Sequence, residues 1–290
     1  MIYQISHRTV YEYDEPVTVS HHAARVKARL TPLQERSAWS LRISPEPAVR
    51  KMRTDYFGNR VCFFSIQELH QRLEIVAESR VRIDAGLPPE PERSPAWEEV
   101  AATLRDPPAP EALEAQQYIF DSAHVRLSPA LAEFAEVSFS PDRALLDAVL
   151  DLNHRIHSEF TFDAKATTVA TPLEQVLERR RGVCQDFTHL ALGCLRSLGL
   201  AARYVSGYLR THHDPDKPHL IGADATHAWL SVFCPGYGWV DFDPTNDLLP
   251  RFEHITVAYG RDFADVSPVS GIITGGGEHR VQVAVHVQPL

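Results

Sequence analysis

The periodicity of apolar residues changes once along this chain, and that change limits the folds it can adopt. From Ile2 to about Ile83, apolar and polar residues alternate in short segments separated by turn residues, which is the pattern of half-buried strands. Beyond residue 140, apolar residues recur every three or four positions, which is typical of amphipathic helices. Seven prolines lie between residues 87 and 110, a density expected of a connection rather than of a packed element. The predicted organisation is a β-rich N-terminal domain at 1–86, a Pro-rich connection at 87–139 and an α+β domain at 140–290.

Composition is that of an ordinary globular protein and argues against some partners. The 290 residues are 44% hydrophobic and 23% charged. The net charge of -9, with both signs interspersed, disfavours a nucleic-acid partner, which needs a basic face. No run approaches the roughly 18 apolar residues of a membrane helix, and the N-terminus alternates like a strand rather than resembling a signal peptide. We therefore expect a cytoplasmic protein without a nucleic-acid or membrane partner.

The second domain should combine helices with a few strands. Ser140-Pro141 and Thr171-Pro172 each offer a cap residue followed by proline, a combination that begins helices. A third helix is expected from about Cys184 to Gly199, because its apolar residues fall on one face and glycine can end it. Strands are predicted at 201–209, 226–233 and 238–243, with a last strand in the alternating segment near the C-terminus.

One of the four cysteines stands where a helix is expected to begin. With no export signal and no paired spacing, Cys62, Cys184, Cys194 and Cys234 should be free thiols rather than disulfides or zinc ligands. Cys184 follows a helix that ends at glycine, so the free N–H groups and dipole of the next helix favour its thiolate and a developing oxyanion. Most free cysteines are instead small buried hydrophobes, and Cys194 on the apolar stripe fits that description. Cys184 is the candidate nucleophile.

A nucleophilic cysteine needs a base, and His227 at the start of a predicted strand is the best candidate. A histidine there, beside the aromatic Trp229, has a purely structural alternative. The other histidines weighed are His189, which is on the helix of Cys184 and points elsewhere, and His212, His213 and His219, which fall in a polar loop.

The imidazole in turn needs an acceptor that orients it, and the next strand offers Asp241 and Asp243 on one face. If Val232 pairs with Gly238 across a five-residue turn, His227 lies directly opposite Asp243. We therefore predict that Asp243 orients His227, while a role in opening a turn is the structural alternative for Asp243.

Three segments then occur in a characteristic order: R-G-V-C-Q-D-F-T-H-L, T-H-A-W and G-W-V-D-F-D-P-T-N. They resemble motifs of the transglutaminase-like superfamily, specifically of bacterial proteins with a β-rich domain before a transglutaminase core. The resemblance covers about residues 140–250 and implies Cys184 as nucleophile, His227 as base and Asp243 as its orienter. It also implies a papain-like core, in which the cysteine helix packs on an antiparallel sheet that carries the histidine and the aspartate. Animal members use calcium, but no D-x-D-x-D-G loop occurs here, so no metal or cofactor is expected.

These features favour acyl transfer through a thioester on a peptide or amide substrate. The acyl group would pass to water, as in a peptidase or amidase, or to an amine, as in a transglutaminase. Hydrolysis is slightly preferred because water needs no dedicated site. The alternative is a catalytically inactive protein- or peptide-binding module of the same fold, although all three catalytic residue types are present. A peptide or protein substrate is the expected partner.

Overall fold

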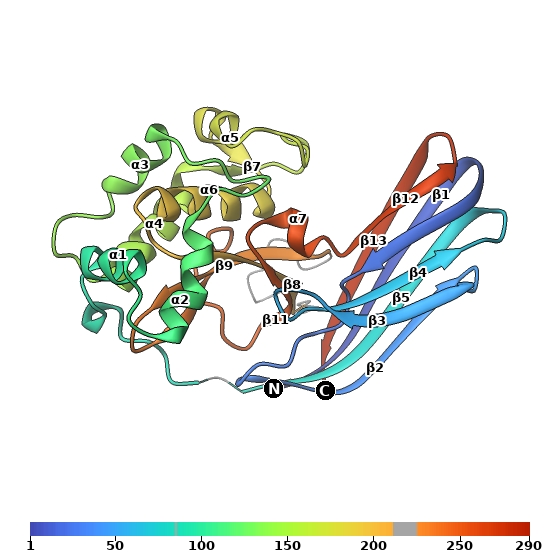
Figure 1. Ribbon diagram of the computed structural model, residues 1–290, viewed down its shortest axis with the longest axis horizontal. Coiled ribbons are helices and arrows are strands. Elements are labelled where there is room, and N and C mark those ends of the chain that lie inside the picture. Colours follow the sequence, from blue (N-terminus) through green and yellow to red (C-terminus); the bar gives the residue numbers. More distant parts are fainter. Residues whose placement is uncertain (85, 211–224) are drawn as a thin grey trace, which may run out of the picture.

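The computed structural model describes residues 1–84, 86–210 and 225–290, which form two packed units (Figure 1). One unit is a curled antiparallel sheet built from both ends of the chain, and the other is a group of helices around a smaller sheet. The predicted α+β class with a β-rich N-terminal part is confirmed. Across the described ranges, none of the helices combines the length and apolar character needed to cross a membrane.

The larger sheet is organised around its longest strand, β1. The first half of β1 pairs with β5 and the second half with β4, while β2 and β3 extend the sheet outward in the order β2-β5-β1-β4-β3. An irregularity in the pairing between Glu12 and Val17 lets one strand serve two parts of the curled sheet. The strands of the N-terminal part are β1 (Ile2–Ala24), β2 (Gln34–Ser44), β3 (Val49–Thr54), β4 (Arg60–Ile66) and β5 (His70–Ile83).

The C-terminal strand belongs to the N-terminal sheet, although we expected it to complete the second domain. Two strands, β12 (Val269–Gly275) and β13 (His279–Pro289), return across the molecule and pair antiparallel with β1 (Figure 1). Val285 and Val287 are buried there. Alternating residues predict that a strand forms, but the sheet edge that accepts it is decided by long-range packing.

Residues 87–139, predicted as a Pro-rich connection, instead hold three α-helices whose buried faces join the main core. Pro110 and Pro129 occupy first-turn positions, where the missing N–H costs nothing. The helical elements before the cysteine helix are η1 (Pro91–Arg93), α1 (Trp97–Arg105), α2 (Pro110–Gln116), η2 (Gln117–Ile119), α3 (Pro129–Glu136), α4 (Leu145–Glu159) and α5 (Leu173–Arg179).

The two predicted helix starts lie too early, the first by four residues and the second by one. Ser140 and Pro141 precede a turn in which Asp142 has a positive φ of 61°, and α4 begins only at Leu145. Helix α5 begins after Pro172 without a side-chain cap. Pro141 is followed by a turn, whereas Pro172 is followed directly by the helix. The local sequence is alike in the two places and does not distinguish these outcomes.

The smaller sheet carries the elements that matter most for the site. Its order is β10-β9-β8-β11, all antiparallel, and helix α6 packs against β8 and β9. A two-stranded parallel pair, β6 with β7, lies beside the start of α6. The elements are β6 (Thr161–Phe162), β7 (Arg181–Gly182), α6 (Cys184–Ser197), β8 (Ala202–Leu209), β9 (His227–Cys234), β10 (Gly238–Phe242), β11 (His254–Gly260) and α7 (Phe263–Val266).

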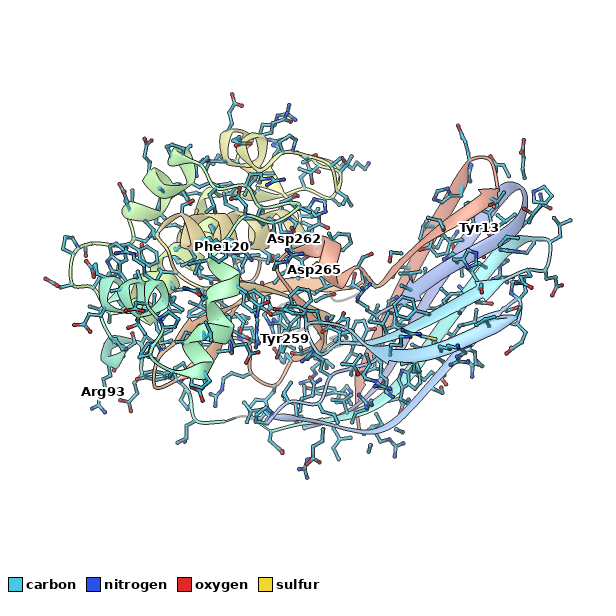
Figure 2. All side chains as sticks on the ribbon, in the orientation of Figure 1. Tyr13, Arg93, Phe120, Tyr259, Asp262 and Asp265 are labelled. Carbon is cyan, nitrogen blue, oxygen red and sulfur yellow. The ribbon has the colours of Figure 1, made fainter. Side chains whose placement is uncertain are left out.

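Side chains of the N-terminal part cap the free edge of β11. The Gln34 amide donates to the carbonyl of Thr256 and accepts from the Thr256 N–H, both at 2.8 Å. Asn59 makes the same pair of bonds to Tyr259, at 2.7 and 2.8 Å, and Figure 2 shows Tyr259 at the junction of the two units. Each amide thus takes the place of a neighbouring strand, which leaves no open edge at these positions.

We expect Gln34→Ala to lower the free energy of unfolding by about 2 kcal/mol, because the buried Thr256 N–H loses its acceptor. Denaturant unfolding measures this difference. Gln282→Ala, the same change at an exposed position of β13, should stay within about 0.5 kcal/mol of wild type. Equal effects of the two substitutions would contradict the capping role of Gln34.

Candidate active site

Cys184 is the first residue of α6, as predicted. Val183 before it is extended, with φ -113° and ψ 177°, and its N–H donates to the carboxylate of Asp186 at 2.8 Å. Asp186 also accepts the hydroxyl of Thr167 at 2.6 Å, which ties the preceding loop to the helix start. The Cys184 side chain therefore sits at the N-terminal turn of α6, where the helix dipole favours negative charge.

The four thiols differ in exposure. Cys184 is half-buried, whereas Cys62, Cys194 and Cys234 are buried. Burial raises the pKa of Cys194 and of Cys234 to about 12, and it also raises the pKa of Cys62. These three thiols stay protonated near neutral pH, which leaves Cys184 as the accessible one.

His227 and Asp243 are brought together as predicted. His227 Nε2 donates to Asp243 Oδ2 at 2.8 Å, and both side chains are fully buried. Burial alone would lower the pKa of His227. The charge and hydrogen bond of Asp243, with a further contribution from Cys184, outweigh burial and raise this pKa to about 10. Since Nε2 is engaged by Asp243, Nδ1 is the ring nitrogen left for proton exchange with Cys184.

The hairpin register that we predicted is wrong, even though the contact it was meant to explain is present. Gly238 pairs with Cys234 rather than with Val232, because Gly236 and Gly238 both have positive φ and make a tighter turn. Asp243 lies just beyond β10, in a bridge with Leu248, and its carboxylate reaches His227 from there.

Asp241 has a different neighbour from Asp243. It lies opposite Ser231, and its Oδ2 accepts the Trp229 indole N–H at 3.1 Å. The indole lies beside His227, with ring centroids 6.0 Å apart. Asp241 thus holds an aromatic neighbour of the imidazole and not the imidazole itself.

The carboxylate of Asp243 accepts five hydrogen bonds. Oδ2 accepts from His227, from His254 Nε2 at 2.9 Å and from the Asn246 side-chain amide at 2.8 Å. Oδ1 accepts the backbone N–H groups of Thr245 at 3.0 Å and Asn246 at 3.2 Å. Burial alone would raise the pKa of Asp243, but its two histidine partners hold the pKa well below its usual value. The carboxylate is therefore ionised and fixed in orientation.

His254 was not predicted from the sequence. It is the first residue of β11, separated from β9 by the intervening strand β8. Gly207 of β8 lets Trp229 of β9 reach His254 across the sheet. A Cβ at position 207 would lie 2.4 Å from the Trp229 ring and 2.1 Å from the carbonyl of Ile255. The Trp229 ring instead passes over the glycine and meets the His254 ring edge-on at 5.0 Å. No local sequence pattern indicates that the Trp229 and His254 rings come into contact.

Of the other histidines weighed as the base, the structure describes only His189. His189 lies on α6 away from Cys184, and its Nε2 accepts the N–H of Phe263 at 3.2 Å. Burial lowers the pKa of His189 to about 3, so it is a neutral structural acceptor. His212, His213 and His219 lie outside the described residues.

His227, Asp243 and His254 also form a group whose ligand-type atoms lie within 4.8 Å of one another. Two imidazoles and a carboxylate are suitable ligands for a transition metal. Here, however, both imidazoles donate to Asp243 Oδ2, which accounts for the closeness of the three groups. The expectation that the site works without a metal or cofactor stays a prediction.

The raised pKa of His227 has a consequence for stability. In the folded protein His227 keeps its proton up to about pH 10, whereas an unfolded histidine releases it near 6.5. This contribution to stability is therefore complete below pH 6.5 and is lost as the pH rises to about 10. Between pH 7 and 9, the free energy of unfolding should fall by up to about 1 kcal/mol per pH unit more in wild type than in His227→Gln. Parallel pH profiles of the two proteins would contradict the assignment.

Comparisons with known proteins agree with this geometry. The family "Bacterial transglutaminase-like N-terminal region" matches residues 3–82, and the "Transglutaminase-like superfamily" matches residues 133–244, a range that contains Cys184, His227 and Asp243. An uncharacterized protein of Mycobacterium tuberculosis is 40% identical over 296 residues, which cover 99% of this chain and 93% of that protein. A protein-glutamine gamma-glutamyltransferase of Pseudomonas aeruginosa is 28% identical over 124 residues, which cover 42% of this chain and 18% of that enzyme.

The fold has a close counterpart among crystal structures. The structure named "Putative Cysteine Protease from Cytophaga hutchinsonii" has a TM-score of 0.76 and 23% identity, and the match covers 99% of this chain and 89% of that one. It shows that the curled sheet and the helical unit occur together in another protein. With matches to both family descriptions and a relative that is similar over its whole length, the chain belongs to the transglutaminase-like superfamily.

Proposed function

We propose that this protein is an acyl-transfer enzyme that uses Cys184 as nucleophile, His227 as base and Asp243 as the residue that orients His227. The observation that carries this proposal is the buried His227, whose Nε2 is held by Asp243 and whose pKa is raised by Asp243 and, to a smaller extent, by Cys184. The substrate class is a peptide or another amide, because a thiol nucleophile at a helix start suits attack on a carbonyl.

In the first half-reaction, the thiolate sulfur of Cys184 bonds to the carbonyl carbon of the substrate. The backbone N–H groups at the start of α6 stabilise the oxyanion that forms. The carbon–nitrogen bond then breaks, and His227 gives its Nδ1 proton to the departing amine. A thioester on Cys184 and a free amine result.

In the second half-reaction, an acceptor attacks the thioester carbon while His227 removes the acceptor's proton. The carbon–sulfur bond breaks and the Cys184 thiolate returns, with the proton kept on His227. Water as acceptor gives a carboxylic acid, and an amine gives a new amide. Throughout both halves Asp243 stays ionised and stabilises the charged imidazole.

Two named relatives support the two acceptors of this proposal. The Pseudomonas protein is described as a protein-glutamine gamma-glutamyltransferase, an acyl transfer from glutamine, but the match covers only 18% of its length. The Cytophaga structure is named as a cysteine protease. A protease passes the acyl group to water, so this name favours water as acceptor. Both names fit an enzyme that acts on an amide bond of a protein or peptide.

We expect incubation with a library of glutamine-containing peptides to yield products that mass spectrometry can identify. Cleavage or deamidation without an added amine identifies water as acceptor, and amine-bearing products identify transfer. Cys184→Ala is the control, since it removes the nucleophile yet opens little space at a half-buried position. Turnover that persists in Cys184→Ala, or no turnover in either protein, would count against the proposal; the second result would favour an inactive peptide-binding module.

Asp243→Asn should lower turnover by roughly 10³- to 10⁴-fold, because an amide can present its N–H₂ to the imidazole and select the wrong tautomer. Asp241→Asn is the matched control, and we expect less than about a tenfold loss because Asp241 bonds Trp229 and not His227. Thermal melting checks that both proteins fold. An inactive Asp241 variant beside an active Asp243 variant would reassign the orienting role.

A further inference from the structure

The unexplained feature of the site is the second imidazole on the carboxylate. We propose that His254 is a positioning residue, which shares the Asp243 oxygen used by His227 and so limits how tightly His227 holds its proton. The inference rests on the proposed function, since it assigns a role within the same proton exchange. Its structural basis is the pair of bonds from His227 and His254 to one oxygen, at 2.8 and 2.9 Å.

The hydrogen bonds assign the protons on the two rings. An ionised carboxylate only accepts, so Nε2 of each histidine carries a hydrogen. Nδ1 of both rings is buried and has no hydrogen-bond partner among the described residues. Each ring therefore presents an Nε2–H to the same carboxylate oxygen, and His254 is a second donor there beside His227.

A second donor at this place opposes positive charge on His227. Its N–H dipole points its positive end at the oxygen that otherwise serves only His227 and the Asn246 amide, and the two rings lie 6.0 Å apart. Oδ2 therefore offers less of its negative charge to His227 than it would without His254. A base that also has to return its proton works best when it does not bind that proton too strongly.

His254 does not simply keep Asp243 in place, because other groups already do. Asn246 and Thr245 hold the carboxylate through three hydrogen bonds, and the Asn153 side chain donates to the Asp243 carbonyl at 3.3 Å. Removal of the His254 donor should thus leave the contact between Asp243 and His227 intact and stronger.

Four titratable groups lie around His227, on three elements. Cys184 lies on α6, Asp243 follows β10, His254 begins β11, and Asp241 on β10 acts through the Trp229 indole. The substitution at His254 leaves the other three groups in place. A change in the titration of His227 is then attributable to the lost donor.

The test compares His254→Phe, which keeps a ring but removes the donor, with His254→Gln, which keeps an N–H donor. His286→Phe makes the same change at an exposed histidine of β13 and serves as the control. Two properties are measured across pH in each protein. They are the rate of Cys184 alkylation by iodoacetamide, followed by peptide mapping, and the charge state of His227, followed by NMR of labelled histidine. Thermal melting confirms that each protein folds.

In His254→Phe we expect the imidazolium of His227 to persist to higher pH, by roughly half a unit to one unit. The pH midpoint of Cys184 alkylation should move lower by a similar amount, because the proton passes more readily from sulfur to ring. His254→Gln and the control should stay close to wild type. Unchanged or oppositely shifted titration in a folded His254→Phe would overturn the inference, as would a Gln variant that shifts as far as the Phe variant.

These results also separate the inference from the proposed function. If His254→Phe shifts the His227 titration while wild-type Cys184 proves inert toward substrates, the positioning role holds and the catalytic proposal fails. If wild type turns over substrate and the titration of His227 does not respond to His254→Phe, the catalytic proposal holds and the inference fails.

Discussion

The carboxylate of Asp243 is the interaction on which the rest of the site depends. A buried charge is tolerated only when it is paired and hydrogen-bonded, and Asp243 is fully buried with five donors around it. These donors come from β9, β11 and the turn after β10, so the carboxylate ties three segments of the smaller sheet together. Loss of any one segment would leave a buried charge without full compensation.

The N-terminal sheet contributes to this arrangement through β11. That strand begins with His254, and a few residues later Thr256 and Tyr259 receive the amides of Gln34 and Asn59. The chain then returns along β12 and β13 to pair with β1, which brings the larger sheet against the same region (Figure 1). Strand β11, which presents His254, is therefore held by side chains of the N-terminal sheet and contributes a residue to the site in the helical unit.

The catalytic candidates were predictable where the reason is local. A helix start at Cys184 follows from a short run of residues, and so does a strand that begins at His227. Asp243 was chosen by a register argument that the structure contradicts, yet the contact forms because a turn residue just beyond β10 reaches back to His227. The prediction that His227 and Asp243 meet is confirmed, but the hairpin register used to justify it is wrong.

The sequence by itself determined the alternation of strands, the later helices and the order of cysteine, histidine and aspartate, because each depends on neighbours a few positions apart. Only the tertiary structure decided that β13 joins β1, that the turn at Gly236 and Gly238 is tight, and that His254 shares Asp243. The first and last of these outcomes depend on which surfaces meet across the chain: Asp243 and His254 are 11 residues apart, and Tyr3 pairs with Pro289, 286 residues away. Periodicity carries no record of such partners, because the same alternating segment can pair with any open edge that buries its apolar face.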